Sequence, residues 1–258
     1  MNAIMHWNAD PVLFSLGPIS VHWYGLLFAT GFIVGLQIMR WIYRQEGREE
    51  TELDRLFLYI LAGTVIGARL GHVIFYAPEY YLQHPLEVLM IWKGGLASHG
   101  GTLGIVVAVF MYARRPDLPS AWWVLDRFCM TAALGGAFIR IGNFFNSEII
   151  GLPVNGGIVF DRFDQVPRHP VMLYESAAYL LIFVITLQVY RHFRAVLKEG
   201  QLFGLFLILL FSARIFLEIF KTRQAAYAQA MDFSVGQWLS VPFVLLGVFL
   251  VLRNRGRS

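Results

Sequence analysis

The chain has 258 residues, of which 57 % are apolar and only 15 % are charged, well below the quarter typical of soluble domains. Apolar runs recur along the whole length, so the composition excludes an ordinary soluble protein and predicts one integral membrane domain over residues 1–258. The net charge of +4 does not indicate a nucleic-acid partner, because the basic residues form short clusters between the apolar runs.

Seven apolar runs of about 20 residues are long enough to cross a hydrocarbon core about 30 Å thick. We therefore expect an all-α transmembrane bundle with spans at residues 20–42, 53–75, 96–113, 120–139, 172–190, 201–219 and 235–252. Residues 1–19 contain two prolines and a glycine, which favours a position in the outer interface rather than a span. Gly63, Gly67 and Gly71 repeat at four-residue spacing, which is typical of close packing between helices.

The basic residues set the expected orientation in the membrane. They concentrate in alternate loops, at residues 40–48, 114–115 and 191–198, and in a C-terminal tail that includes Arg255 and Arg257. Loops rich in lysine and arginine face the cytoplasm, so we expect the N-terminus outside and the C-terminus inside. No basic residue precedes Arg40, so the first span lacks the charged start of a signal peptide and should be retained.

The stretch from Arg140 to Gly151, Arg-Ile-Gly-Asn-Phe-Phe-Asn-Ser-Glu-Ile-Ile-Gly, follows directly on the apolar run that ends at Ile139. Its asparagines and glycines favour an end to the helix, so we expect the backbone to offer free amide groups here. Non-helical backbone at membrane depth must line a cavity or be buried in protein. The stretch is therefore a candidate site on the outer side.

Other polar residues should lie in the same outer half of the bilayer: Tyr24, His99, and Arg214 with Glu218. Each also has a structural interpretation. Tyr24 could belong to an interfacial aromatic belt, and His99 could be a buried histidine bonded to a carbonyl, although four glycines around it suggest close approach of another group. Arg214 and Glu218, at i and i+4, could form only an intrahelical pair.

Arginine at membrane depth costs about 2.5 to 3.5 kcal/mol on insertion scales. Retention of Arg69, Arg140 and Arg214 together therefore favours anionic partners, and guanidinium groups grip phosphate oxygens bidentately. Asp126 and Arg127 lie in the inner part of their span and are interpreted as structural.

The single cysteine, Cys129, excludes an intramolecular disulfide and any metal site built from several cysteines. In its apolar span it is interpreted as inert core. The spacings His-x-x-x-His and Cys-x-x-Cys and the motif Gly-x-Ser-x-Gly are all missing, so the sequence gives no support to a metallohydrolase or a serine hydrolase.

The Arg140–Gly151 stretch resembles the signature of prolipoprotein diacylglyceryl transferases, inner-membrane enzymes that begin bacterial lipoprotein maturation. Further runs that resemble motifs of this family are His22–Gly25, Ser98–Gly101, Pro167–Pro170, Leu173–Glu175, Arg214–Phe220 and Gly236–Gln237. The departures are Ile139 where glycine is usual, Val171 and Met172 where a hydroxyl residue and glutamine are usual, and Lys221 where arginine is common. Lysine lacks the planar fork of arginine.

The resemblance implies transfer of the diacylglyceryl group of phosphatidylglycerol to the lipobox cysteine of a preprolipoprotein signal peptide, in the bacterial inner membrane, with the site towards the periplasm. It implies that His99, Arg140 and Arg214 are catalytic and needs no cofactor and no metal. The substrate-binding residues that it implies are Tyr24, Arg140, Asn143, Asn146, Glu148, Gly151 and Glu218. Membrane lipids surround such a protein, and no nucleic acid is involved.

The residues suit this chemistry, since a histidine has the intrinsic pKa of a general base and fixed arginines stabilise charge on a departing phosphate. The competing interpretation is a transporter or binding protein for an anionic lipid or organic anion that uses the same arginines. Two features speak against it: the sequence has no internal repeat, and its polar residues lie on one side rather than at the midplane.

Overall fold

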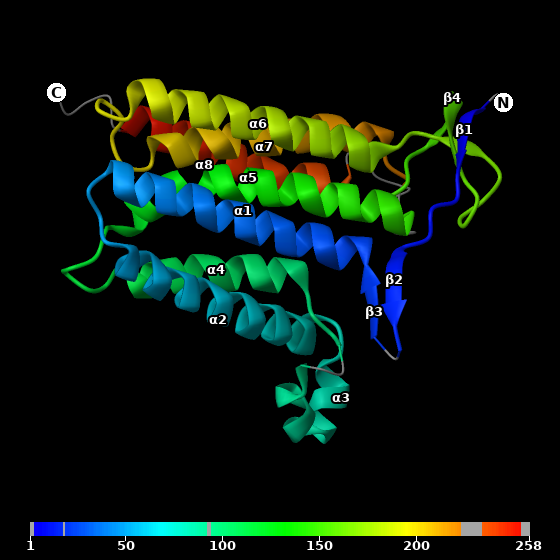
Figure 1. Ribbon diagram of the computed structural model, residues 1–258, viewed down its shortest axis with the longest axis horizontal. Coiled ribbons are helices and arrows are strands. Elements are labelled where there is room, and N and C mark those ends of the chain that lie inside the picture. Colours follow the sequence, from blue (N-terminus) through cyan, green and yellow to red (C-terminus); the bar gives the residue numbers. More distant parts are fainter. Residues whose placement is uncertain (1–2, 18, 92–93, 223–233, 254–258) are drawn as a thin grey trace. The chain divides into compact units, whose positions relative to one another are not determined.

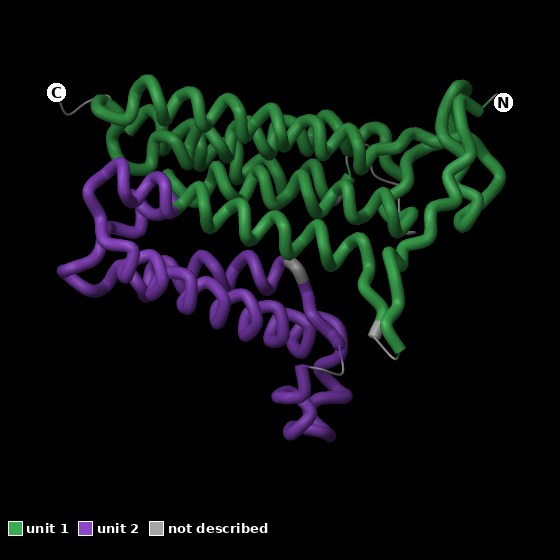
Figure 2. The backbone as a smooth tube through the Cα atoms, in the orientation of Figure 1, with its two compact units in different colours: residues 1–39, 126–258 green, residues 40–125 purple. Residues whose placement is uncertain are grey.

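A computed structural model describes residues 3–17, 19–91, 94–222 and 234–253. The chain divides into two compact units (Figure 2): unit 1 comprises Met1–Met39 and Asp126–Ser258, and unit 2 comprises Arg40–Leu125. Arg255 and Arg257, which contribute to the predicted orientation, lie outside the described residues.

Within the described part of the chain, six helices have the length and apolar composition of membrane spans. They are α1 (Trp23–Gln45), α2 (Glu50–Phe75), α5 (Ala121–Asn146), α6 (Val171–Phe193), α7 (Gln201–Leu217, continued by the 3₁₀ turn η3, Glu218–Phe220) and α8 (Val235–Arg253), as Figure 1 shows. These helices match six of the seven predicted spans. The seventh, predicted at residues 96–113, corresponds to α4 (Ser98–Tyr112), which has 15 residues and is shorter than the other six.

In unit 2, α2 and α4 pack with their backbones in contact, and α3 (Pro78–Gln83) and η1 (Pro85–Leu89) follow α2. The contact is made by glycines on both helices, because a Cβ at Gly71 would lie only 2.8 Å from Gly100 Cα. Gly63 and Gly67 face Gly104 in the same way. The predicted packing role of these glycines is therefore confirmed.

In unit 1, the end of one helix is held by a buried acid from another. Asp126 on α5 is 2 % exposed, and its two carboxylate oxygens accept the backbone N–H groups of Gly200 and Phe203, each at 2.7 Å. These N–H groups belong to the start of α7 and have no partner inside that helix. Asp126 is thus a structural cap, as predicted.

The all-α prediction is wrong for the segments outside the helices. β1 (Ala3–Trp7) pairs in parallel with β4 (Pro153–Phe160), β5 (Pro167–Arg168) pairs antiparallel with β4, and β2 (Val12–Leu16) forms a hairpin with β3 (Ile19–His22). Ile158 and Phe160 of β4 are buried against Phe144 and Met172, and Trp7 of β1 packs on the same cluster. This cluster joins the sheet to the end of α5.

The predicted end of the helix at Arg140 is also wrong. α5 continues through Gly142 and Asn143 to Asn146. Tertiary contacts override the low helix propensity of these residues, because Tyr24 packs on the bare backbone of Gly142 and the Asn143 side chain is bonded on both sides. The signature is therefore half helix and half loop.

Candidate active site

Arg140 lies in the last two turns of α5, and its side chain is 17 % exposed. Nε lies 2.9 Å from Oε2 of Glu175 on α6, and Nη1 donates to Oδ1 of Asn143 at 3.2 Å. Nη2 has no polar partner in the described part of the chain. Arg140 is thus held on two sides and keeps one amino group free.

Asn143 connects this arginine to the loop that follows. Its Nδ2 donates to Oε2 of Glu148 at 2.8 Å, and Nδ2 of Asn146 donates to Oε1 of the same carboxylate at 3.3 Å. Glu148 is exposed, so its carboxylate is oriented by two amides while it remains accessible. The structure therefore brings Arg140, Asn143, Asn146 and Glu148 into one network.

The backbone around Glu148 is strained. Ser147 N–H bonds to Phe144 O at 3.1 Å and Glu148 N–H to Asn143 O at 2.9 Å, the pattern of a Schellman helix end, which usually has glycine at the left-handed position. Here Ser147 has φ 54° and the β-branched Ile149 has φ 58°. Such residues cost about 1 to 3 kcal/mol and cluster at functional sites.

Tyr24 and Gly151 both pack against backbone in this region. A Cβ at Gly142 would lie 2.8 Å from Cδ2 of the Tyr24 ring, so Tyr24 contacts the signature helix and is more than part of an aromatic belt. A Cβ at Gly151 would lie 2.6 Å from Phe220 O, where Gly151 forms a β-bridge with Lys221. Any side chain at Gly151 would separate the loop from the end of α7.

Arg168 ties the same loop to the segment before β5. Its Nη1 donates to Gly151 O at 3.3 Å, and its Nε donates to Oδ2 of Asp164 at 2.9 Å. This hydrogen-bonded guanidinium lowers the pKa of the Asp164 carboxyl below its usual range.

A pocket of about 400 Å³ opens beside the strained loop. Its lining residues are Ser147, Glu148, Ile149, Ile150, Phe163 and Thr222. The Ser147 hydroxyl is buried and has no hydrogen-bond partner among the described residues, while the Thr222 hydroxyl donates to Ile150 O at 2.9 Å. Within the described residues, no three His, Cys, Asp or Glu side chains are grouped so that they could hold a metal ion.

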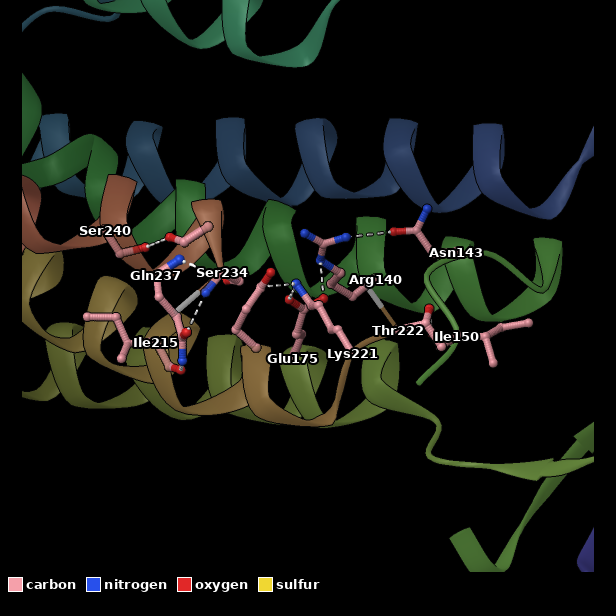
Figure 3. Close-up of polar contacts among 12 residues, drawn as sticks. Arg140, Asn143, Ile150, Glu175, Ile215, Lys221, Thr222, Ser234, Gln237 and Ser240 are labelled. Carbon is pink, nitrogen blue, oxygen red and sulfur yellow. Dashed lines mark hydrogen bonds and ion pairs between the residues drawn. The ribbon is translucent and has the colours of Figure 1, made fainter. Parts of the chain in front are cut away.

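Glu175 and Lys221 complete the site and were not among the predicted site residues. Glu175 is 1 % exposed, and its Oε1 lies 2.8 Å from Nζ of Lys221, which also lies 3.2 Å from Oε2 of Glu218 (Figure 3). The sequence does hold a signal for Glu175, because an acid inside an apolar span is rare and requires a partner. Glu175 belongs to the Leu173–Glu175 run, for which the family resemblance implies no role.

Arg214 lies in the last turn of α7 and is partly exposed, and its guanidinium bonds to none of the described residues. The intrahelical pair with Glu218 is not observed, since Glu218 pairs with Lys221 instead. Gly236 at the start of α8 leaves room for the Glu218 carboxylate, because a Cβ there would lie 2.9 Å from its Oε1. Arg214 therefore keeps its guanidinium for another partner.

His99 belongs to unit 2, where it lies in the first turn of α4 and is exposed. Its ring contacts Phe75 and Tyr76, with centroid distances of 5.9 and 5.7 Å. It makes no hydrogen bond with the described residues, so the carbonyl-bonded alternative is not observed.

Arg69, also in unit 2, corrects an expectation. The expected anionic partner is absent among the described residues, and the guanidinium instead donates to the backbone carbonyls of Glu87, Val88, Gly94 and Gly95. Arg69 thus fixes the segment that leads into α4.

Comparison with known proteins places the chain in a family. Residues 11–253 match the family described as prolipoprotein diacylglyceryl transferase. Among the relatives named phosphatidylglycerol–prolipoprotein diacylglyceryl transferase, that of Tolumonas auensis is 55 % identical over 96 % of this chain and 97 % of its own length. That of Chloroherpeton thalassium is 49 % identical over 98 % and 95 %, and that of Bacteroides fragilis is 38 % identical over 96 % and 94 %. The chain therefore belongs to the prolipoprotein diacylglyceryl transferase family.

Proposed function

We propose that this protein transfers the diacylglyceryl group of phosphatidylglycerol to the thiol of the lipobox cysteine in a preprolipoprotein, the first step of lipoprotein maturation. Family membership over residues 11–253 supports the activity. The strongest structural support comes from Arg140, which is oriented by Glu175 and Asn143 and has an amino group free for an anion. A guanidinium of this kind suits the phosphate of an anionic lipid.

The reaction is a displacement at an sp3 carbon. The thiol loses its proton to a base, the sulfur attacks the glycerol carbon that carries the phosphate ester, and the carbon–oxygen bond breaks. The bonding pair leaves with the phosphate oxygen, so the products are a thioether and glycerol phosphate. The step is balanced without a cofactor or a metal.

Three residues have assigned roles in this proposal. His99 acts as the base, because a free thiol of pKa about 8.5 is mostly protonated at neutral pH and an imidazole can accept its proton. Arg140 and Arg214 stabilise the charge that develops on the departing phosphate. The supporting contacts come from Tyr24, Asn143, Asn146, Glu148, Gly151 and Glu218.

We place the protein in the bacterial inner membrane as one transferase domain, with seven spans including the shorter α4, and the site towards the periplasm. The arginine-rich loops support an outer N-terminus and a cytoplasmic C-terminus. A topology reporter fused after Ser258, or inserted in the loop near Arg48, should therefore read as cytoplasmic. An extracytoplasmic signal at either position would reverse the orientation.

The activity is tested by mixing purified protein, phosphatidylglycerol and a lipobox peptide, and by searching for a diacylglyceryl thioether by mass spectrometry. A peptide with serine in place of the lipobox cysteine, and phosphatidylcholine in place of phosphatidylglycerol, are the matched controls. Binding of phosphatidylglycerol without any thioether product would favour a lipid-binding or transport protein instead.

A further inference from the structure

Glu175 is a buried acid for which the proposed chemistry has no use. It lies on α6, is 1 % exposed, and each of its oxygens faces one cation: Oε2 faces Arg140 Nε at 2.9 Å and Oε1 faces Lys221 Nζ at 2.8 Å. A buried carboxylate without such partners would be strongly destabilising. The two cations therefore balance the charge of Glu175 and hold it in place.

The contacts of Glu175 are ionic rather than aligned hydrogen bonds. Both oxygens lie within 3 Å of a nitrogen, yet neither meets the angular requirement for a hydrogen bond. Figure 3 shows the carboxylate between the two cationic groups, which come from α5 and from the segment after η3. Electrostatic attraction, more than hydrogen-bond geometry, thus holds Glu175, Arg140 and Lys221 together.

The position of Glu175 decides which edge of the Arg140 guanidinium can meet an anion. A guanidinium can grip a phosphate through Nε and Nη2, or through Nη1 and Nη2. Glu175 occupies the first edge because it lies against Nε, whereas Nη2 has no partner among the described residues. The edge formed by the two Nη groups remains for a ligand through Nη2 and the second N–H of Nη1, because the first N–H of Nη1 bonds Asn143 Oδ1.

We propose that Glu175 is a positioning residue, which holds Arg140 through Nε so that both Nη groups face the phosphate of phosphatidylglycerol. This inference rests on the proposed function, and it names how the substrate phosphate is held. It also assigns Lys221 as the counter-ion of Glu175 and Glu218 rather than a phosphate ligand. An ammonium between two carboxylates needs no planar fork, so lysine in place of the usual arginine is compatible with this role.

The test compares Glu175→Gln with the unaltered protein, in turnover per folded molecule. Glutamine keeps the shape and removes the charge, so we expect a loss of about 10- to 100-fold, as for other residues that orient a reacting group. A residue that acts through Arg140 should lose its effect once Arg140 is altered. In an Arg140→Lys background, Glu175→Gln should therefore cause little further loss.

Two results would overturn the proposal. The first is near-normal turnover per folded molecule in Glu175→Gln. The second is a loss of the same size in both backgrounds, because a purely structural acid would reduce the two activities independently.

Glu175→Gln leaves two partly buried cations without their shared carboxylate and can prevent folding. The double variant Glu175→Gln with Lys221→Met removes one cation together with the anion, so we expect it to restore the folded amount. Its turnover per folded molecule should stay low, because Arg140 is still not positioned. Recovery of wild-type turnover in this variant would contradict a positioning role.

Lipid binding separates this proposal from the proposed function. Retention of phosphatidylglycerol by the purified protein, measured by native mass spectrometry against phosphatidylcholine, should fall in Glu175→Gln and show the same dependence on Arg140. If the unaltered protein binds phosphatidylglycerol in this way but makes no thioether, the proposed function fails while the positioning role stands. Retention that Glu175→Gln leaves unchanged would refute the positioning role.

Discussion

Two arginines in apolar helices, one in each unit, are held by their surroundings in different ways. Arg69 in unit 2 is 4 % exposed and uses Nε and both Nη groups to bond four backbone carbonyls, with the Tyr81 ring 4.9 Å away. Arg140 in unit 1 forms an ion pair with one carboxylate and a hydrogen bond with one amide, and Nη2 has no partner among the described residues. Every guanidinium nitrogen of Arg69 thus donates a hydrogen bond within the protein. Arg140 is held in place, but one of its nitrogens has no partner among the described residues.

The difference teaches that depth in the membrane does not by itself identify a binding arginine. Both residues lie in apolar helices, and the insertion cost applies to both. What separates them is the number of donors that the protein leaves free. Arg214, whose guanidinium bonds to none of the described residues, resembles Arg140 in this respect.

The largest effect is expected at Arg140 and Arg214. Arg140→Ala and Arg214→Ala should each reduce turnover by about a hundred- to thousandfold, because each removes a preorganised donor to the developing phosphate charge. Arg140→Lys and Arg214→Lys keep the charge but lose the fork, so they should recover activity only in part. The measurement is diacylglyceryl transfer per folded molecule.

Protein amount must be measured beside turnover in all four variants. If the arginines were only structural, alanine would lower the folded amount and the surviving molecules would keep their activity. Near-normal turnover in both alanine variants would therefore mean that Arg140, like Arg69, has a structural role and does not bind the phosphate.

Arg69→Ala should show the opposite behaviour. It leaves four partly buried carbonyl groups without the Arg69 donors, so we expect the free energy of unfolding to fall by about 3 kcal/mol. Thermal unfolding in detergent measures this loss, with Arg69→Lys as the milder control. Molecules that remain folded should transfer at close to the wild-type rate. Normal stability with lost turnover would instead make Arg69 a ligand of the substrate.

The sequence was enough for six spans and for most of the signature network. The spans follow from long apolar runs, and four of the predicted site residues lie within nine consecutive residues on α5 and its end. A local pattern can specify such features because the interacting residues are close in the chain.

The missed features all depend on partners far away in sequence. β1, near the N-terminus, pairs with β4 in the second half of the sequence. The carbonyl groups that accept hydrogen bonds from Arg69 lie 18 to 26 residues after it. Glu175 is visible as an acid in an apolar span, but its pairing with Arg140 and Lys221 depends on how α5, α6 and the end of η3 pack. Residue type alone could not distinguish a satisfied arginine from a free one.

The comparison extends to two buried acids, with a smaller expected effect. Asp126 bonds backbone N–H groups at the start of α7, whereas Glu175 pairs with Arg140. Asp126→Ala should lower the free energy of unfolding by about 1 to 2 kcal/mol, the usual cost of a lost helix cap, and Asp126→Asn should lower it less. Turnover per folded molecule should not change in either variant. A loss of turnover with normal stability would mean that the N-terminal end of α7 influences the site.

The smallest effect is expected at Cys129, the only thiol of the protein. Its side chain is 1 % exposed, and Sγ donates to the carbonyl of Asp126 at 3.1 Å. The reaction consumes a thiol of the substrate, and a buried cysteine in an apolar span is too inaccessible to take its place. Cys129→Ser keeps a donor of similar size, so turnover should stay at the wild-type level and the free energy of unfolding should fall by only about 1 kcal/mol. Both quantities are measured on purified protein, with Cys129→Ala as the control that removes the donor. Abolished transfer in a folded serine variant would instead indicate a covalent intermediate on the Cys129 thiol. The arginines would then stabilise the phosphate that leaves when this intermediate forms.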